Sequence, residues 1–256
     1  MLQEVADLIP EVARPLLVAI DGPDAAGKTH FADALAEVLG RQGRAVLRTG
    51  IDWFHHPRAH RYARGRTALT VWERSFDFAA LRRLLVEPWL AGPGAEFVTR
   101  VHDIASDRPV LAPVERVPEG GVLVFDGVFC QRPELINAWD LAIWLDVPPG
   151  ESARRMGIRD GIPADLDGPA GRYLGAQQIY RDAVDPVGSA DVVIDNTDWS
   201  APILQREPSS SWVRQGDRLA RWVSVPADRT DLVERLDELI ETERVDSAPR
   251  ERSRPD

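Results

Sequence analysis

The chain has 256 residues, of which 44% are apolar, and its 41 acidic and 31 basic side chains give a net charge of −10. This composition excludes a wholly disordered chain and argues against non-specific nucleic-acid binding. The length suits one α/β domain, or one such domain with an embellishment.

Three further features of the sequence indicate the compartment. A single cysteine, Cys130, excludes an internal disulfide and is typical of a reducing cytosol. No apolar run approaches the roughly 18 residues that a membrane helix needs. Acidic side chains at Glu4, Asp7 and Glu11 stand where a secretory signal would be basic and then apolar. We therefore expect a cytoplasmic protein that binds neither membranes nor nucleic acid.

Segments of strand and helix character alternate along the chain. After a short amphipathic lead-in at 2–13, the pattern predicts buried strands at 15–20, 122–126 and 141–146, further strands at 45–49 and 192–195, and an alternating strand at 96–101. It predicts helices at 28–39, 76–86, 150–159 and 172–184. An ordered excursion at 52–75 and a loop at 161–171 interrupt them. This order predicts a three-layer α/β fold, with a mainly parallel sheet flanked by helices.

The pattern weakens beyond residue 200. A strand at 221–225 and a helix at 228–243 are the elements expected there. We therefore predict a main domain over 1–200, an extension over 201–245 and a disordered tail over 246–256.

A complete phosphate-loop motif lies between the first predicted strand and the first predicted helix. The run Gly22-Pro23-Asp24-Ala25-Ala26-Gly27-Lys28-Thr29 fits G-x-x-x-x-G-K-[ST]. Backbone N–H groups of such a loop bind phosphate oxygens, the lysine reaches the β- and γ-phosphates, and the threonine hydroxyl binds Mg²⁺. Lys28 is also the only lysine of the chain, since 30 of its 31 basic residues are arginine. Gly22, Asp24, Ala25, Ala26, Gly27, Lys28 and Thr29 are therefore predicted to bind ATP.

Two carboxylates are expected beside this loop, because the carboxyl ends of parallel strands line one crevice. Asp126 ends an apolar strand and could hold Mg²⁺ together with Thr29, or it could cap the next turn. Asp52 comes after the strand at 45–49 and is placed to accept a proton from an attacking hydroxyl. The nearby histidines, His55, His56 and His60, lack zinc-ligand spacing and are interpreted as pocket lining or solvated loop.

Three arginines share the predicted helix at 150–159. Arg155 and Arg159 are four residues apart and therefore lie on one face, with Arg154 beside them. They could close over a transferring phosphoryl group as part of a small lid at about 150–172. The alternative is a solvated basic face that pairs with Glu151 and Asp160.

Together these motifs resemble the uridine kinase family, within the group of P-loop kinases that also holds pantothenate kinase and phosphoribulokinase. The resemblance rests on 22–29, Ile51-Asp52-Trp53-Phe54, Ser75-Phe76-Asp77, His102-Asp103, Phe125-Asp126-Gly127 and the arginines of 154–160, and it covers about 15–197. It implies a P-loop NTPase fold with a small lid, and Mg²⁺- and ATP-dependent phosphorylation of a nucleoside 5′-hydroxyl.

The resemblance also suggests roles for single residues. Asp52 matches the catalytic aspartate of the family, and Lys28, Arg155 and Arg159 would act on the phosphates with it. The implied acceptor-binding residues are Asp52, Phe54, Glu73, His102 and Arg154, and Asn196 would lie on the adenine side. At Trp72-Glu73-Arg74-Ser75 and at His102 the chain departs from the family's pattern, which bears on the acceptor.

These observations leave three hypotheses on function. The first is an ATP-dependent kinase of uridine or a related nucleoside. The second keeps this chemistry with another alcohol, such as pantothenate, as acceptor. The third is a nucleotide-binding regulator without turnover, although a regulator has no need of Asp52. A homo-oligomer is left open.

Overall fold

The computed structural model describes residues 1–161 and 170–207, all of which belong to one compact unit. The strand expected at 221–225, the helix expected at 228–243 and the tail at 246–256 lie outside the described residues. Among the described residues, no helix is long and apolar enough to cross a membrane.

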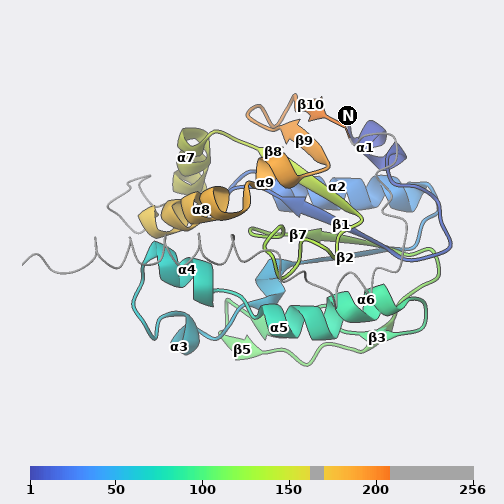
Figure 1. Ribbon diagram of the computed structural model, residues 1–256, viewed down its shortest axis with the longest axis horizontal. Coiled ribbons are helices and arrows are strands. Elements are labelled where there is room, and N and C mark those ends of the chain that lie inside the picture. Colours follow the sequence, from blue (N-terminus) through green and yellow to red (C-terminus); the bar gives the residue numbers. More distant parts are fainter. Residues whose placement is uncertain (162–169, 208–256) are drawn as a thin grey trace, which may run out of the picture. The chain divides into compact units, whose positions relative to one another are not determined.

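The central sheet has six strands in the order β10-β9-β8-β1-β7-β2 (Figure 1). Its strands are β1 (Leu16–Asp21), β2 (Val46–Gly50), β7 (Val122–Asp126), β8 (Leu141–Asp146), β9 (Val192–Asp195) and β10 (Ile203–Arg206). All neighbours are parallel except β10, which runs antiparallel to β9. The mainly parallel α/β sheet expected from the sequence is confirmed, and it continues through β10 into residues that the sequence assigned to the extension.

Unbroken apolar runs form the central strands because helices cover both of their faces. Every residue of β1 and of β7 is buried. The register pairs Ile20 of β1 and Gly50 of β2 with Asp126 of β7. The carboxyl ends of three neighbouring strands therefore meet at one edge of the sheet.

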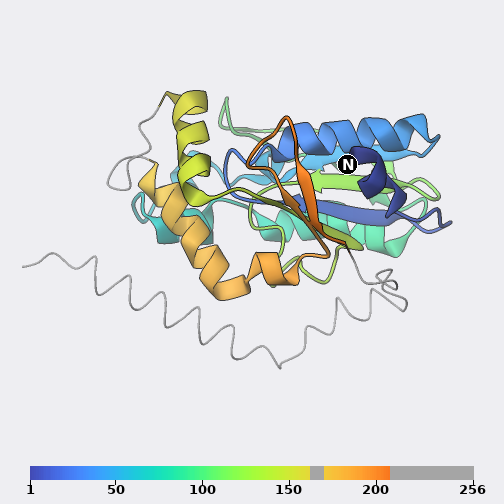
Figure 2. The same cartoon turned by 90° about the horizontal axis from the view of Figure 1, so that it is seen from above.

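One face of the sheet carries α1 (Leu2–Asp7) and α2 (Lys28–Arg41), as Figure 2 shows. The apolar side of α2 contributes Phe31, Ala32, Leu35, Val38 and Leu39 to a single buried cluster with strand residues such as Ile20. Truncating a fully buried leucine such as Leu35 to alanine typically costs about 2–5 kcal/mol. The packing of this face therefore holds α2 against the sheet.

Figure 2 shows α8 (Gly171–Val184) and α9 (Pro186–Ser189) over the opposite face. The core beneath them is aromatic. Phe125 of β7 stacks on Trp139 with ring centroids 5.3 Å apart. Tyr180 of α8 packs against Trp72, Phe129 and Trp144. These contacts attach α8 to the sheet and to α4 (Ala68–Arg74).

The helix expected at 76–86 begins at Phe78 and continues past its predicted end. It consists of α5 (Phe78–Leu81), a π-helical turn over Arg82–Val86 and α6 (Glu87–Ala91). Pro88 explains the wide turn, since it has no N–H for the carbonyl of Leu84 and its ring would clash with that carbonyl. The N–H of Val98 bonds to Leu84 O instead, at 3.0 Å.

The strand expected at 96–101 is wrong in length. Only β3 (Glu96–Phe97) forms, and it pairs with β6 (Glu115–Arg116) outside the main sheet. A second two-residue pair joins β4 (His102–Asp103) to β5 (Arg108–Pro109).

The excursion at 52–75 contains a 3₁₀ turn, η1 (Ile51–Phe54), followed by α3 (Arg58–Arg61) and α4. The helix expected at 150–159 is α7 (Pro149–Asp160). Figure 1 shows α4, α7 and α8 grouped at one end of the sheet.

Candidate active site

The phosphate loop connects β1 directly to α2, as the sequence predicts. Gly27 caps the helix with φ +89°, a left-handed conformation that glycine adopts without strain. A β-carbon added there would lie 3.0 Å from Asn196 Nδ2. The ammonium group of Lys28 donates to Pro23 O at 2.7 Å and to Gly22 O at 3.0 Å. The only lysine of the chain therefore lies folded over the phosphate loop.

Side chains from three other elements hold this loop from behind. The buried Asn196, just after β9, donates to Ala26 O at 2.6 Å. Ser152 of α7 donates to Asp24 O at 2.7 Å, and Gln177 of α8 donates to the Asp24 carboxylate at 2.5 Å. The loop is thus fixed to the last parallel strand and to both helices that flank 162–169.

Asp126 ends β7 at the front of the loop. Its Oδ2 accepts a hydrogen bond of 2.7 Å from the hydroxyl of Thr29, and its Oδ1 lies 2.7 Å from a guanidinium nitrogen of Arg48. Gly50 passes so close that an added β-carbon would lie 2.4 Å from Asp126 Oδ1. Asp126 is therefore held by partners from both neighbouring elements, α2 and β2.

Asp52 lies in the 3₁₀ turn after β2, where the pocket surrounds its carboxyl group although solvent reaches it. The side chain is 79% exposed. Partial loss of solvation in the pocket and the negative charge of Asp126 raise the pKa of Asp52 above its ordinary value. A carboxylate with a raised pKa is a stronger proton acceptor, which suits a general base.

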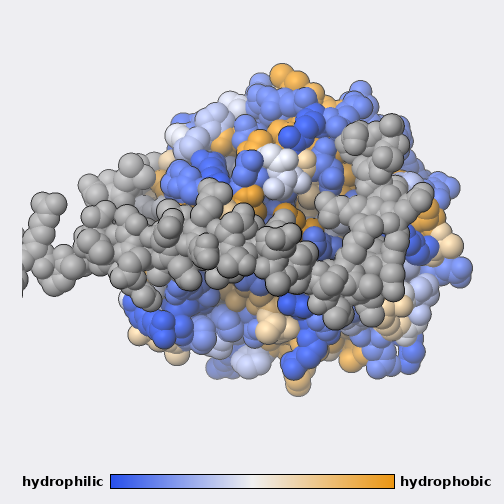
Figure 3. Space-filling view, viewed as in Figure 1, coloured by the Kyte–Doolittle hydropathy of each residue, from blue (hydrophilic) through white to orange (hydrophobic). Residues whose placement is uncertain are grey.

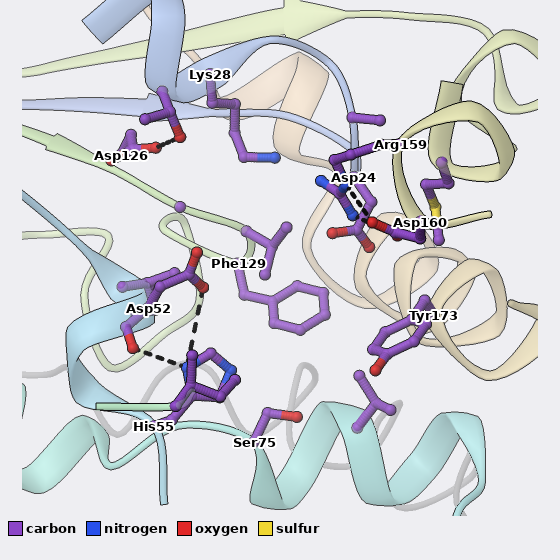
Figure 4. Close-up of a pocket in the computed structure, with 18 of the residues that line it drawn as sticks. Asp24, Lys28, Asp52, His55, Ser75, Asp126, Phe129, Arg159, Asp160 and Tyr173 are labelled. Atoms are coloured by element: carbon purple, nitrogen blue, oxygen red, sulfur yellow. Dashed lines mark hydrogen bonds and ion pairs between the residues drawn. The ribbon is translucent and has the colours of Figure 1, made fainter. Parts of the chain in front are cut away.

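These groups line one pocket of about 710 Å³ (Figure 4). Lys28 and Asp126 lie above Asp52 in the view, and Asp24 and Arg159 lie across the opening. Of the residues expected to bind ATP or Mg²⁺, those lining the pocket are Asp24, Ala25, Gly27, Lys28, Thr29 and Asp126. Gly22 and Ala26 belong to the same loop but do not line the pocket, and neither does Asn196, which donates to Ala26 from the end of β9.

The other half of the pocket is less polar, and we call it the acceptor half. It is lined by His55, Val71, Ser75, Phe76, Ile104, Phe129, Arg172 and Tyr173. His55 is buried and its Nδ1 lies 2.9 Å from Asp52 O. Burial lowers the pKa of His55 to about 4, so this imidazole is neutral at pH 7. An organic acceptor bound there would have its hydroxyl close to Asp52.

The arginines of α7 divide between the pocket and the surface. Arg155 and Arg159 line the pocket, whereas Arg154 does not. Arg155 pairs with Glu151 at 2.7 Å, and Arg159 pairs with Asp160 through two contacts of 2.7 and 2.8 Å. All three arginines are therefore ion-paired with Glu151 or Asp160, as expected for the alternative of a solvated basic face. Two of them, Arg155 and Arg159, also line the pocket.

Four residues expected to bind the acceptor lie outside the pocket lining. Phe54 is fully buried in the core, and His102 of β4 is buried with its Nε2 3.4 Å from Asp107. Glu73 is exposed on α4, and Arg154 is exposed on α7 beside Glu151. The structure therefore brings Asp52, but none of these four, into the pocket.

Arg48 is a site residue that the sequence analysis missed. It pairs with Asp126 and, through Nε at 2.9 Å, with Asp33 of α2. The sequence did offer a signal for Arg48, because it is a charged side chain inside the strand predicted at 45–49. Arg172 and Tyr173 gave no comparable signal, because α8 is only weakly amphipathic and its contact with α4 is tertiary.

A further carboxylate, that of Asp21, is completely buried at the end of β1. It accepts hydrogen bonds from Gly22 N at 2.8 Å, from Tyr180 Oη at 2.5 Å and from Gln131 N at 3.2 Å. Burial raises the pKa of Asp21 to about 6, against the opposing effect of these hydrogen bonds. This network joins the residue that precedes the phosphate loop to α8.

The oxygen atoms at the front of the loop are suitable ligands for Mg²⁺. The Thr29 hydroxyl and the Asp126 carboxylate, 2.7 Å apart, are the hard oxygen ligands that this ion takes, usually with several waters retained. Within 1–161 and 170–207, no group of three or more His, Cys, Asp or Glu residues could hold a metal ion. His55, His56 and His60 accordingly form no zinc site there.

The fold and this loop define a three-layer α/β protein with a mainly parallel sheet and a phosphate loop between β1 and α2. A protein described as a possible uridine kinase from Bacillus stearothermophilus superposes with a TM-score of 0.61 at 23% identity, over 75% of this chain and 96% of that one. A candidate fructose transport system kinase from Silicibacter sp. TM1040 gives 0.56 at 22% identity, over 69% and 92%. No family model matches the chain, and no curated protein matches it in sequence. At these identities the likeness shows the fold, which is the one the sequence motifs predict.

Proposed function

We propose that this protein is an ATP-dependent small-molecule kinase that transfers the γ-phosphate of ATP to an alcohol. The observation that carries this proposal is the convergence of Lys28, the Thr29–Asp126 pair and Asp52 on one pocket. A phosphate loop alone serves switches and motors as well. An acceptor hydroxyl needs a nearby proton acceptor, and Asp52, a carboxylate with a raised pKa, faces the loop across a partly apolar pocket.

In the proposed reaction the chain mainly positions groups and stabilises charge. Asp52 accepts the proton of the acceptor hydroxyl as that oxygen bonds to the γ-phosphorus, and the bond to the bridging oxygen breaks to release ADP. Loop N–H groups, the Lys28 ammonium and Arg155 and Arg159 stabilise the charge on the phosphates. Thr29 and Asp126 would hold Mg²⁺, whose positive charge would help to neutralise the phosphates.

Uridine or a related nucleoside is the acceptor that the sequence resemblance suggests. The test incubates the full chain with Mg·ATP and a panel of nucleosides, pantothenate and sugar phosphates, and measures ADP release. We expect at least one alcohol to stimulate release by the wild type, and Asp52→Asn to lower that stimulated rate by roughly 10²–10⁴-fold.

The matched control is Asp7→Asn, which changes an exposed carboxylate on α1 that does not line the pocket. It should leave acceptor-stimulated release largely unchanged. If no compound stimulates release, or if Asp52→Asn behaves like the wild type, the kinase proposal is wrong.

A further inference from the structure

The stretch before α4 has an unusual charge pattern for so acidic a protein. Residues 53–72 contain four arginines and three of the five histidines but no aspartate or glutamate. The chain carries 41 acidic residues in 256, so about three would be expected in any twenty. This stretch runs from the end of η1 through α3 into α4. Two of its residues, His55 and Val71, line the acceptor half. The surface over α3 is mostly hydrophilic (Figure 3, lower left).

Three guanidinium groups gather around one ring in this region. Their central carbons lie 4.4 Å (Arg66), 5.3 Å (Arg61) and 5.5 Å (Arg172) from the centroid of the Tyr62 ring. Arg61 and Arg66 come from the acid-free stretch, and Arg172 comes from the first turn of α8. We call Arg61, Arg66 and Arg172 the arginine cluster.

The cluster has no carboxylate partner within 4.0 Å among the residues that the structure describes. Other arginines in that part of the chain do have one, namely Arg14, Arg41, Arg48, Arg82, Arg116, Arg132, Arg154, Arg155 and Arg159. Arg172 Nε is also buried without a hydrogen-bond partner there. Contact with the Tyr62 ring offsets part of the mutual repulsion of three like charges, and an anion would offset the rest.

The cluster is continuous with the acceptor half of the pocket. Arg172 lines that half, and its Nη2 donates to the Tyr173 hydroxyl, which belongs to the same wall, at 2.8 Å. His55, the other basic group of this half, is neutral at pH 7. Among the lining residues named for the acceptor half, Arg172 carries the positive charge, and the Asp52 carboxylate lies at the edge of this half, 3.9 Å from His55.

We propose that the acceptor is an alcohol that carries a carboxylate or phosphate group, and that the arginine cluster binds this group while the hydroxyl faces Asp52. The inference rests on the proposed kinase function and narrows its acceptor from a neutral nucleoside to an anionic alcohol. Guanidinium groups bind both anions through paired N–H donors. The alternative is a solvated basic face, in which arginines cover a tyrosine ring without a ligand.

The experiment compares alcohols with and without an anionic group under saturating Mg·ATP. The pairs are orotidine with uridine, pantothenate with panthenol, glycerate with glycerol, and ribose 5-phosphate with ribose. In at least one pair we expect kcat/KM to be at least roughly tenfold higher for the anionic member. The carboxylate and phosphate members show which anion is preferred.

The arginines are then changed one at a time to glutamine. Arg61→Gln, Arg66→Gln and Arg172→Gln should each raise the KM for the anionic acceptor by roughly tenfold, with little effect on its neutral partner or on the KM for ATP. Arg116→Gln, which removes an exposed arginine from the β3–β6 pair, is the control. It should change neither the KM for the anionic acceptor nor the KM for ATP. Thermal melting of each variant shows that it is folded.

Three outcomes would overturn the inference. If neutral acceptors are preferred and the glutamine variants match the wild type, the anionic acceptor is wrong while the kinase function stands. If the variants raise the KM for ATP instead, the cluster belongs to the nucleotide. If no member of any pair is phosphorylated, neither proposal survives.

Discussion

Thr29 Oγ1 donates a hydrogen bond of 2.7 Å to Asp126 Oδ2, although 97 residues separate the two in the chain. The bond joins the first turn of α2 to the end of β7, so the hydroxyl and the carboxylate predicted to bind Mg²⁺ are already adjacent. Arg48 occupies the second oxygen of Asp126 at 2.7 Å. The Asp126 carboxylate is therefore oriented by the protein itself, and its position depends on the close approach of β2.

Gly50→Ala tests this close approach. A β-carbon at residue 50 would lie 2.4 Å from Asp126 Oδ1 and 2.8 Å from Asp126 O, so the carboxylate must move. We expect the free energy of unfolding in urea to fall by about 1–3 kcal/mol, as in other overpacked sites, and kinase activity to fall with it.

The control is Gly40→Ala, in the last turn of α2, where an added β-carbon meets nothing within 4 Å. Helix propensity predicts that this change stabilises the protein by up to about 1 kcal/mol. Equal stability and activity of Gly50→Ala and the wild type would contradict the role given to this contact.

The pH dependence of activity should report Asp52. Its pKa is raised by partial desolvation and by Asp126, so the carboxyl group keeps its proton to a higher pH than an ordinary aspartate. As a base it must be deprotonated, and kcat/KM should therefore fall as the pH decreases through this raised value. In Asp52→Asn the residual rate should lose that acidic limb. An unchanged acidic limb in Asp52→Asn would assign it to another group.

Asp21 should make the stability of the folded state depend on pH. Its pKa is about 6 in the folded protein and near 3.8 when exposed, so between these values the unfolded chain releases a proton that the folded chain retains. Its contribution to stability is fully present below about pH 4 and is lost as the pH rises through 6. The change in the free energy of unfolding is about 3 kcal/mol.

Urea unfolding of Asp21→Asn beside the wild type isolates this effect from other carboxylates. The variant should become more stable relative to the wild type as the pH rises from 4 to 6, and the difference should then level off. A difference that does not vary with pH would show that Asp21 has an ordinary pKa.

The parts of the fold that were predictable from sequence are those with an unbroken local pattern. The apolar runs of β1, β7 and β8 are long enough to be recognised, and the phosphate-loop motif predicts a helix directly after β1. Pro88 explains why the pattern failed at 76–86, since a single residue without an N–H changes the turn around it. β10 was missed because it is an exposed edge strand with alternating burial.

The candidate site was predictable to the extent that its residues stand at strand ends. Asp52 and Asp126 were expected in the crevice from the strand order alone, and both line the pocket. Arg172 and Tyr173 reach it only because α8 packs against α4, which is distant in the sequence, and no local pattern reports such a contact. Phe54 and His102, expected at the acceptor on resemblance, instead lie buried outside the pocket lining.

The most direct test of the whole account is calorimetric titration of the purified chain with Mg·ATP. The wild type should bind one nucleotide, and Lys28→Ala should weaken binding at least roughly tenfold, since it removes a charged donor to phosphate. Arg41→Ala, which removes an exposed cation from the far end of the same helix, should bind like the wild type. No binding by the wild type, or equal binding by Lys28→Ala, would contradict the assignment of this pocket to a nucleotide.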